Sequence, residues 1–535
     1  MTRIHSYHPV VLGLLLILMT TAACDRKATL PQQFAPSDTQ ADIFPDYKDI
    51  VIPSNIAPLN FMVKDSGAVA AVAQLQGANG KEILEQADDN MTIRFDTTEW
   101  KNLLSENKGK DIQVNVYVQT GENWLKHKPH TLTVAEESID PFLSYRLIEP
   151  GYELYRQVGI YQRNLTNWEE RVVYENNRTY DDNENHCVNC HNYRNQSTQD
   201  MLFHVRSNYA GTIIIQNGKA HKIQVKDSTI LTSAVYPAWH PTEDLVAFST
   251  NKTGQTFHAY HPEKLEVMDE ASDMLLYDVK NNEVTHVFRS ENELETFPAW
   301  APSGDRLYYC SAQVGHLIPP GTPDSLVAMQ LMFRYDSIYY DLKSVSFDPK
   351  TRTFSNPRTE VEASAQERSI TLPRVSPDGR YVLYTQGKYG QFHIWHKSSD
   401  LWVKDLQTDN CYNLYQANSP DTESFHSWSS NGRWIAFSSR RIDGNYTRIF
   451  LTYFDQKGQA HKAFPIPQED PEYNTLLLKS YNVPELTKDA VRISLPDLNH
   501  CVRETEAEMA KYKTQLQPAL TDRAAGTNRF ISITH

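Results

Sequence analysis

Three residues about a third of the way along the chain could hold a redox cofactor. Cys187, Cys190 and His191 stand in the stretch His-Cys-Val-Asn-Cys-His. Cys-x-x-Cys-His is the attachment signature of a c-type haem. Its thiols form thioethers with the haem vinyl groups, and its histidine becomes an axial ligand of the iron. Two residues between the cysteines suit a tight helical turn. The motif therefore predicts one covalent haem c on Cys187, Cys190 and His191.

A Cys-x-x-Cys pair also occurs in thioredoxin-like redox sites and in zinc sites. The redox pair needs a βαβ setting, and the flanking segments DDNENH and NYRNQS do not offer one. A zinc site needs a second pair of ligands at short spacing, which is not apparent. The adjacent histidine and the export signal described below favour haem, because c-type haem is attached outside the cytoplasm.

The sixth iron ligand is predicted to be His204, which follows His191 by 13 residues. Met201 lies at a similar distance and would raise the reduction potential. Other candidates are histidines farther along the chain, namely His258, His261 and His316. An iron with an open coordination position is a further alternative.

The N-terminus is typical of an export signal. Arg3 precedes an apolar core from Val10 to Met19, which is too short to span a bilayer as a mature anchor. Thr21-Ala22-Ala23-Cys24 then resembles a bacterial lipoprotein cleavage box, with Thr21 where leucine is usual. The prediction is a signal peptide at 1–23, lipidation of Cys24 and a polar tether over 24–45. An ordinary or an uncleaved signal are the alternatives. A lipid anchor would hold the chain in the bacterial cell envelope, on the periplasmic or cell-surface side.

The net charge limits the class of expected binding partners, and the cysteine count limits the number of possible disulfides. The 535-residue chain has a net charge of -14, so nucleic acid is not an expected partner. An acidic surface could orient a basic redox protein.

Cys310, Cys411 and Cys501 remain after lipid and haem are assigned, which leaves room for one disulfide. Cys310 ends Leu-Tyr-Tyr-Cys, which indicates a buried thiol in a strand.

Residues 46–140 are predicted to form a small β-rich, sandwich-like domain. Ile112 to Val118 and Thr131 to Val134 alternate apolar with polar residues, and Met91 to Phe95 is a third candidate strand. Thr98 to Glu106 is predicted as one short helix. Residues 141–200 are predicted to form a haem-bearing linker, in which Arg146, Arg156 and Arg163 stand among aromatic residues. One arginine could meet a haem propionate, although the aromatic residues could simply pack a domain junction.

Internal repeats organise residues 201–485. Four segments align, beginning at Pro237, Pro298, Pro373 and His426, and each joins two strands through a tight turn. Gly304, Gly379 and Gly432 stand where such turns need positive φ. A second repeat ends in Asp278, Asp348, Asp405 or Asp455, and these recurring residues are predicted to serve the turns. Each unit thus predicts a four-stranded propeller blade.

The Pro-x-Trp-x-Pro-x-Gly pattern resembles the blades of the TolB-like propeller family over about 202–485. Five or six blades are expected, with a partial blade around His204 to Val225 completing the ring and a strand near Tyr473 to Tyr481 closing it. In the tail, 486–535, a helix is predicted from Arg503 to Gln515. The predicted fold is therefore mainly β, with a propeller behind a small β-rich domain.

The whole chain resembles exported lipoproteins that combine a TolB-like propeller with one Cys-x-x-Cys-His motif. That resemblance implies a membrane-anchored monohaem cytochrome that passes single electrons between envelope proteins. One alternative is an envelope interaction or assembly scaffold, as the TolB resemblance implies, in which the haem is structural or a sensor. Another is a haem enzyme with an open iron site. No catalytic triad or carboxylate pair stands out in the sequence.

Overall fold

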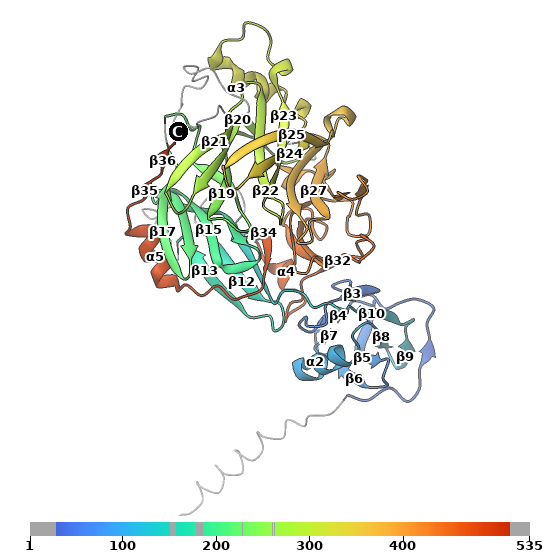
Figure 1. Cartoon of the computed structure of the whole chain (residues 1–535). Coiled ribbons are helices and arrows are strands. Elements are labelled where there is room, and N and C mark those ends of the chain that lie inside the picture. The colour runs from blue at the N-terminus through green and yellow to red at the C-terminus, as the bar shows by residue number, and fades with distance from the viewer. Residues whose placement is uncertain are drawn as a thin grey trace, which may run out of the picture.

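The computed structural model describes residues 28–149, 157–177, 186–226, 228–258, 260–261 and 263–513. The predicted lipidation residue Cys24 and the signal peptide lie outside these ranges. Within them, no helix is both long and apolar enough to cross a membrane. The chain is mainly β, as predicted, and its sheets fall into two groups (Figure 1).

The smaller group is the N-terminal domain, with one seven-stranded sheet, one three-stranded sheet and helix α2 (Thr97–Glu106). Asp96 caps α2, because its carboxylate accepts hydrogen bonds from the amides of Thr98 and Glu99 at 2.8 and 2.9 Å. The strands are β1 (Ala35–Pro36), β2 (Ile43–Phe44), β3 (Ile50–Ile52), β4 (Phe61–Val63), β5 (Ala68–Gly77), β6 (Glu82–Gln86), β7 (Thr92–Ile93), β8 (Asp111–Thr120), β9 (Asn123–Lys126) and β10 (His130–Val134). The predicted strands and helix of this domain are thus present.

The described part of the predicted tether is not a free linker. Strand β1 pairs with β9, and β2 pairs with β4. Ala41 and Ile43 are buried in the domain core. The apolar residues of this polar stretch are few, but they fill a core that the strands of 46–140 do not complete alone.

The larger group consists of six sheets (Figure 1), each built on four antiparallel strands, and two of them gain a short parallel edge strand from residues 508–512, described below. In chain order they contain β11 (Phe142–Ile148), β12 (Val158–Asn164), β13 (Glu170–Glu175) with β34 (Ser480–Thr487); β14 (His186–Arg194), β15 (Ser197–Ser207), β16 (Gly211–Gln216), β17 (Lys219–Gln224); β18 (Ala234–Trp239), β19 (Leu245–Phe257), β20 (Leu265–Asp278), β21 (Glu283–Phe288); β22 (Glu293–Trp300), β23 (Arg306–Gln313), β24 (Asp341–Asp348), β25 (Thr353–Val361); β26 (Ser369–Val375), β27 (Tyr381–Gly387), β28 (Asp400–Asp405), β29 (Cys411–Asn413); and β30 (Glu423–Trp428), β31 (Trp434–Ser439), β32 (Arg448–Tyr453), β33 (Phe464–Pro465).

One edge strand of each sheet faces its neighbours around a common centre. We call β34, β14, β18, β22, β26 and β30 the inner strands. Each contacts the next in this order, and β30 in turn contacts β34. The arrangement is propeller-like, and β34 joins a sheet whose other strands lie more than 300 residues earlier in the chain.

The segment 141–200 is not a linker, contrary to the prediction. Strands β11 to β13 form a sheet with β34, and the Cys-x-x-Cys-His motif lies on the inner strand β14. The prediction failed because this segment lacks the Pro-x-Trp-x-Pro pattern by which the other sheets were found.

The repeated turns have the predicted geometry. Gly304, Gly379 and Gly432 have φ of 75°, 73° and 67°. The strand-ending aspartates accept backbone hydrogen bonds in the next turn, as when Asp405 accepts from the amide of Gln407 at 2.9 Å. Both features confirm the structural role predicted for these residues.

Replacement of Gly304 by alanine is expected to cost about 2–3 kcal/mol of folding free energy. A Cβ there would come within 2.6 Å of the His240 ring, and that ring's Nε2 contacts the Gly304 carbonyl at 2.8 Å. Gly218→Ala is the matched control, because Gly218 has φ of 77° but nothing within 4 Å of its Cβ position. The control should cost only the backbone term, about 1 kcal/mol, in urea unfolding. Equal losses would contradict the steric argument.

The C-terminal segment differs from the prediction. The helix there is α5 (Leu495–Arg503), which Ser494 caps by accepting from the amide of Asp497 at 3.2 Å. Of the residues predicted as helix, Arg503 ends α5, and the described residues after it include β35 (Glu508–Met509) and β36 (Lys511–Tyr512), which pair with β17 and β21. Two further helices are α3 (Asp324–Phe333) and α4 (Tyr473–Leu476).

Candidate functional site

Every inner strand carries a β-bulge at an equivalent position. In each strand a non-glycine residue has positive φ, and the register against the neighbouring strand shifts there. Positive φ is uncommon for such residues, and a bulge redirects side chains. The bulge residues are Cys190 (52°), Tyr236 (47°), Phe297 (55°), Leu372 (57°), Phe425 (30°) and Val483 (49°).

These six residues line one cavity of about 530 Å³. We call it the bulge cavity. Because all six inner strands contribute to its wall, the cavity lies at the centre of the propeller-like group. Cys190 and His191 both line it, together with Asn189. The second cysteine and the histidine of the predicted haem motif therefore face a central chamber.

His191 is buried and poorly satisfied. Neither ring nitrogen makes a hydrogen bond of normal geometry. The Val483 backbone lies beside the ring, and Oε2 of Glu485 is 3.9 Å from Nε2. Burial, aided by the charge of Arg146, lowers the pKa of His191 to about 3. The imidazole is therefore neutral, which is the form that binds a metal.

Cys187 lies on the same strand, opposite Arg206. It is buried, and burial raises the pKa of its thiol, although the charges of Arg146 and Arg206 oppose that rise. It is not among the residues that line the bulge cavity. Neither Cys187 nor Cys190 is in a disulfide, so both sulfur atoms remain available.

The structure does not bring the candidate sixth ligands to the bulge cavity. His204 is buried on β15 opposite Asn189, and its Nδ1 is 2.8 Å from Oγ1 of Thr212. Met201 packs in an apolar core to which β12 to β16 and α5 contribute. His258 contacts Tyr335, and His316 is exposed.

The local backbone also differs from the predicted helical turn. Residues 186–194 are a strand with a bulge between Asn189 and Asn192. The reason is that Cys190-His191 occupies the place that Tyr236-Pro237 and Phe297-Pro298 occupy on β18 and β22. The signal was present in the repeats, whose aromatic-Pro-x-Trp pattern aligns with Cys-His-Asn-Tyr.

The residues fit haem c in three respects. The chamber is within the 300–1,000 Å³ of common cofactor pockets. A neutral histidine without hydrogen-bond partners and a free thiol face it. Its wall combines apolar and aromatic side chains with cationic ones, as the apolar ring and the propionates of a haem require. Of the three motif residues, Cys187 is the one that does not line the cavity.

The remaining cysteines do not join this site. Cys310 is buried on β23, as predicted, and burial raises the pKa of its thiol. Cys411 is exposed and Cys501 is buried on α5. None of the described cysteines is paired, so the optional disulfide among these three is not formed.

A second central cavity, of about 360 Å³, lies farther along the same strands. Trp239, Trp300 and Trp428 line it, so the tryptophans of the repeats serve this end. Arg374 lines both cavities. Beside it, burial raises the pKa of Glu485 to about 7, and the amide of Asn192 donates to that carboxyl at 2.8 Å. Sequence reasoning missed Arg374 and Glu485 because neither stands out locally.

No family model and no curated protein matches the sequence. Among solved structures, prolyl oligopeptidase B from Galerina marginata is similar at 8% identity and a TM-score of 0.31, over 67% of this chain and 50% of that one. A prolyl endopeptidase, from a structural and mechanistic study of two such enzymes, is similar at 12% identity and a TM-score of 0.31, over 62% of this chain and 50% of that one. A chain of the mitotic checkpoint complex is similar at 10% identity and a TM-score of 0.29, over 60% of this chain and 95% of that one. The chain spans about half the length of the two peptidases, and at these TM-scores no activity is transferred to it.

Proposed function

We propose that this protein is a lipid-anchored, monohaem c-type cytochrome of the bacterial envelope, which passes single electrons between partner proteins. The six sheets would be the blades of a closed propeller that serves as a docking platform. The observation that carries the proposal is the placement of Cys190 and His191 in the wall of the bulge cavity.

In this proposal Cys187 and Cys190 would hold the haem through thioethers, and His191 would bind its iron. When bound, the haem supplies reversible one-electron chemistry at its iron. The chain's own contribution is positional. The bulge on β14 turns Cys190 and His191 toward the chamber, and burial keeps His191 neutral. Tyr236, Phe297 and Phe425 line the same chamber and would shield a haem bound there from water.

The decisive test is covalent haem in the full-length protein, produced in a host with c-type haem maturation. Wild-type protein should keep haem after denaturing electrophoresis and give a c-type pyridine haemochrome spectrum. The double variant Cys187→Ser/Cys190→Ser should lose covalent haem entirely. Cys411→Ser is the matched control, since Cys411 is exposed and outside the cavity, and it should keep full haem content. Folded wild-type protein without covalent haem would refute the proposal.

The cavity wall favours one second candidate, a haem enzyme with an open iron site. Among the described residues that line the bulge cavity, His191 is the one histidine, and no methionine is present. The side chains that commonly complete a six-coordinate haem are therefore not arranged around it. Reduced protein that binds carbon monoxide would favour the open site, whereas a low-spin iron that cycles reversibly without binding it would favour electron transfer.

A further inference from the structure

The bulge cavity has a group of arginines without an ion-pair partner in its wall, although the charge of Glu485, which lies outside that wall, acts on Arg374. Arg146, Arg206 and Arg374 come from β11, β15 and β26, and all three line the cavity. Among the described residues, none of them forms an ion pair. Arg146 donates only to the carbonyl of Val188 at 3.1 Å, and Arg374 only to that of Pro373 at 3.3 Å. Arg206 makes no side-chain hydrogen bond to the described residues.

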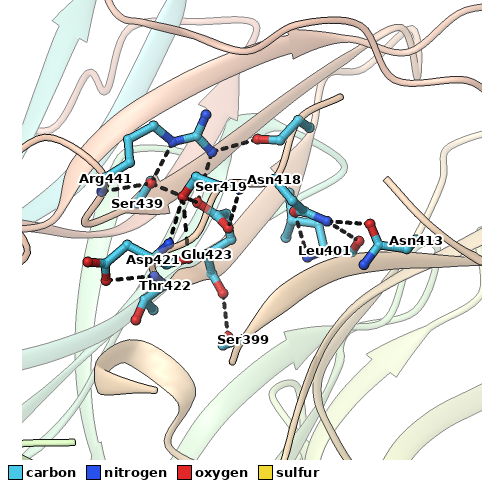
Figure 2. Close-up of polar contacts among 11 residues, drawn as sticks. Ser399, Leu401, Asn413, Asn418, Ser419, Asp421, Thr422, Glu423, Ser439 and Arg441 are labelled. Carbon is cyan, nitrogen blue, oxygen red and sulfur yellow. Dashed lines mark hydrogen bonds and ion pairs between the residues drawn. The ribbon is translucent and has the colours of Figure 1, made fainter. Parts of the chain in front are cut away.

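Other buried or partly buried arginines of this protein donate hydrogen bonds to several partners each. Arg448 is fully buried, and its guanidinium donates to the carbonyls of Asn474, Lys479 and Leu477 at 2.6–2.8 Å. Arg441 donates to the Glu423 carboxylate at 2.8 Å and to Ser439 at 2.9 Å (Figure 2). Buried cations are normally satisfied in this way, because desolvation of an unpaired charge is costly. Arg146 and Arg374, which are partly buried, are thus exceptions within their own fold, whereas Arg206 is exposed and adds a solvent-facing cation to the same cavity wall.

The charges of the three arginines affect the same residues of the cavity wall and its surroundings. Arg146 and Arg206 both bear electrostatically on Cys187 and Tyr236. Arg146 and Arg374 both bear on His191. Lys252 adds a fourth cation to the wall, although it is also paired with Glu270 at 3.2 Å. No Asp or Glu side chain is among the described residues that line this cavity.

We propose that Arg146, Arg206 and Arg374 form a binding site for a carboxylate or similar oxyanion group inside the bulge cavity. Guanidinium groups match such groups through paired N–H donors, and a bound anion would satisfy the donors that the protein leaves free. Two sources share this chemistry: the propionates of a bound haem and a free small anion. In the first case the inference rests on the proposed function, and in the second it does not.

The test begins with full-length Cys187→Ser/Cys190→Ser protein, which cannot hold haem covalently. Sodium sulfate is titrated at constant ionic strength, balanced with chloride, and binding is followed by calorimetry and by the unfolding temperature. Saturable binding is expected, and Arg146→Gln or Arg374→Gln in this background should weaken it about tenfold or more. Arg368→Gln is the matched control, because Arg368 is exposed and outside the cavity, and it should leave binding unchanged. Sulfate binding that is absent, or equal in all variants, would overturn the site.

Two further measurements keep the inference decidable. Without sulfate, Arg146→Gln should lower the unfolding temperature only slightly, because it removes a cation without an ion pair and one hydrogen bond to the Val188 carbonyl; a loss as large as that of a core variant would contradict this account. Holo protein then separates the sources. Loss of the sulfate response on haem attachment identifies the propionates as the occupants, whereas a retained response identifies a free anion. If no haem attaches at all, the proposed function fails while the sulfate result still decides this inference.

Discussion

Replacement of Trp434 by alanine is expected to destabilise the whole protein by about 3–5 kcal/mol. Trp434 lies on β31 and is fully buried. Its ring belongs to a core that strands of the N-terminal domain share with β31, β32 and β33, and its Nε1 donates to the carbonyl of Glu137 at 3.3 Å. The substitution leaves a cavity that both groups of sheets line, so neither can avoid the loss.

Calorimetry or urea unfolding of the variant should show one cooperative transition at lower stability. The polar contacts of the same interface support this expectation, since Asp140 accepts from the Ser430 amide and hydroxyl, each at 2.6 Å. Trp124→Ala is the control, because Trp124 is only half-buried on β9, and it should cost far less. Two separate transitions, with only one of them shifted by Trp434→Ala, would show that the domains unfold independently.

Stability of the haem-free protein is expected to be highest near pH 7 and to fall steeply toward pH 5. Burial lowers the pKa of six histidines to about 3 or 4, below the 6.5 of an unfolded chain. These are His130, His186, His191, His204, His393 and His426. Each stabilises the fold while neutral and loses that contribution as pH falls below 6.5, because the unfolded chain then binds the proton.

Three buried acids act in the opposite direction. Burial raises the pKa of Asp269, Glu423 and Glu485 to about 7. Their protonated forms favour the fold, and that contribution is lost as pH rises through 7. Near pH 5 the histidines outnumber the acids by about three protons, so the free energy of unfolding should change by roughly 4 kcal/mol per pH unit.

Urea unfolding between pH 5 and 8 measures this slope directly. His393→Gln should reduce it by about one proton, or about 1.4 kcal/mol per pH unit. The His393 ring is 3.0 Å from the Tyr389 carbonyl and 3.2 Å from Oγ1 of Thr371, positions that a glutamine amide can also bond. His316→Gln, at an exposed histidine, should leave the slope unchanged. A flat pH profile in the wild type would mean that the histidines are not buried in solution.

Much of the architecture could be predicted from local sequence because it depends on local rules. The turn glycines, the strand-ending aspartates and helix α2 with its Asp96 cap follow from φ preferences and hydrogen bonds over a few residues. The four repeats were visible because they share the same tight turn between two strands, and three of them also carry a tryptophan at the same position, namely Trp239, Trp300 and Trp428. The two sheets that depart from this motif, β14 to β17 and β11 to β13 with β34, were recognised only in part or not at all.

The candidate site also has one part that the sequence could predict and another that only the tertiary structure shows. The sequence by itself determined the chemistry on offer, namely two thiols and a histidine at the spacing of a haem attachment motif. Only the tertiary structure decided that the motif lies on a bulged inner strand, with Cys190 and His191 in a central chamber and His204 outside its wall. It also brought together Arg146, Arg206 and Arg374, which are up to 228 residues apart. The physical reason is that a bulge is a local event, whereas the chamber exists only where six inner strands meet.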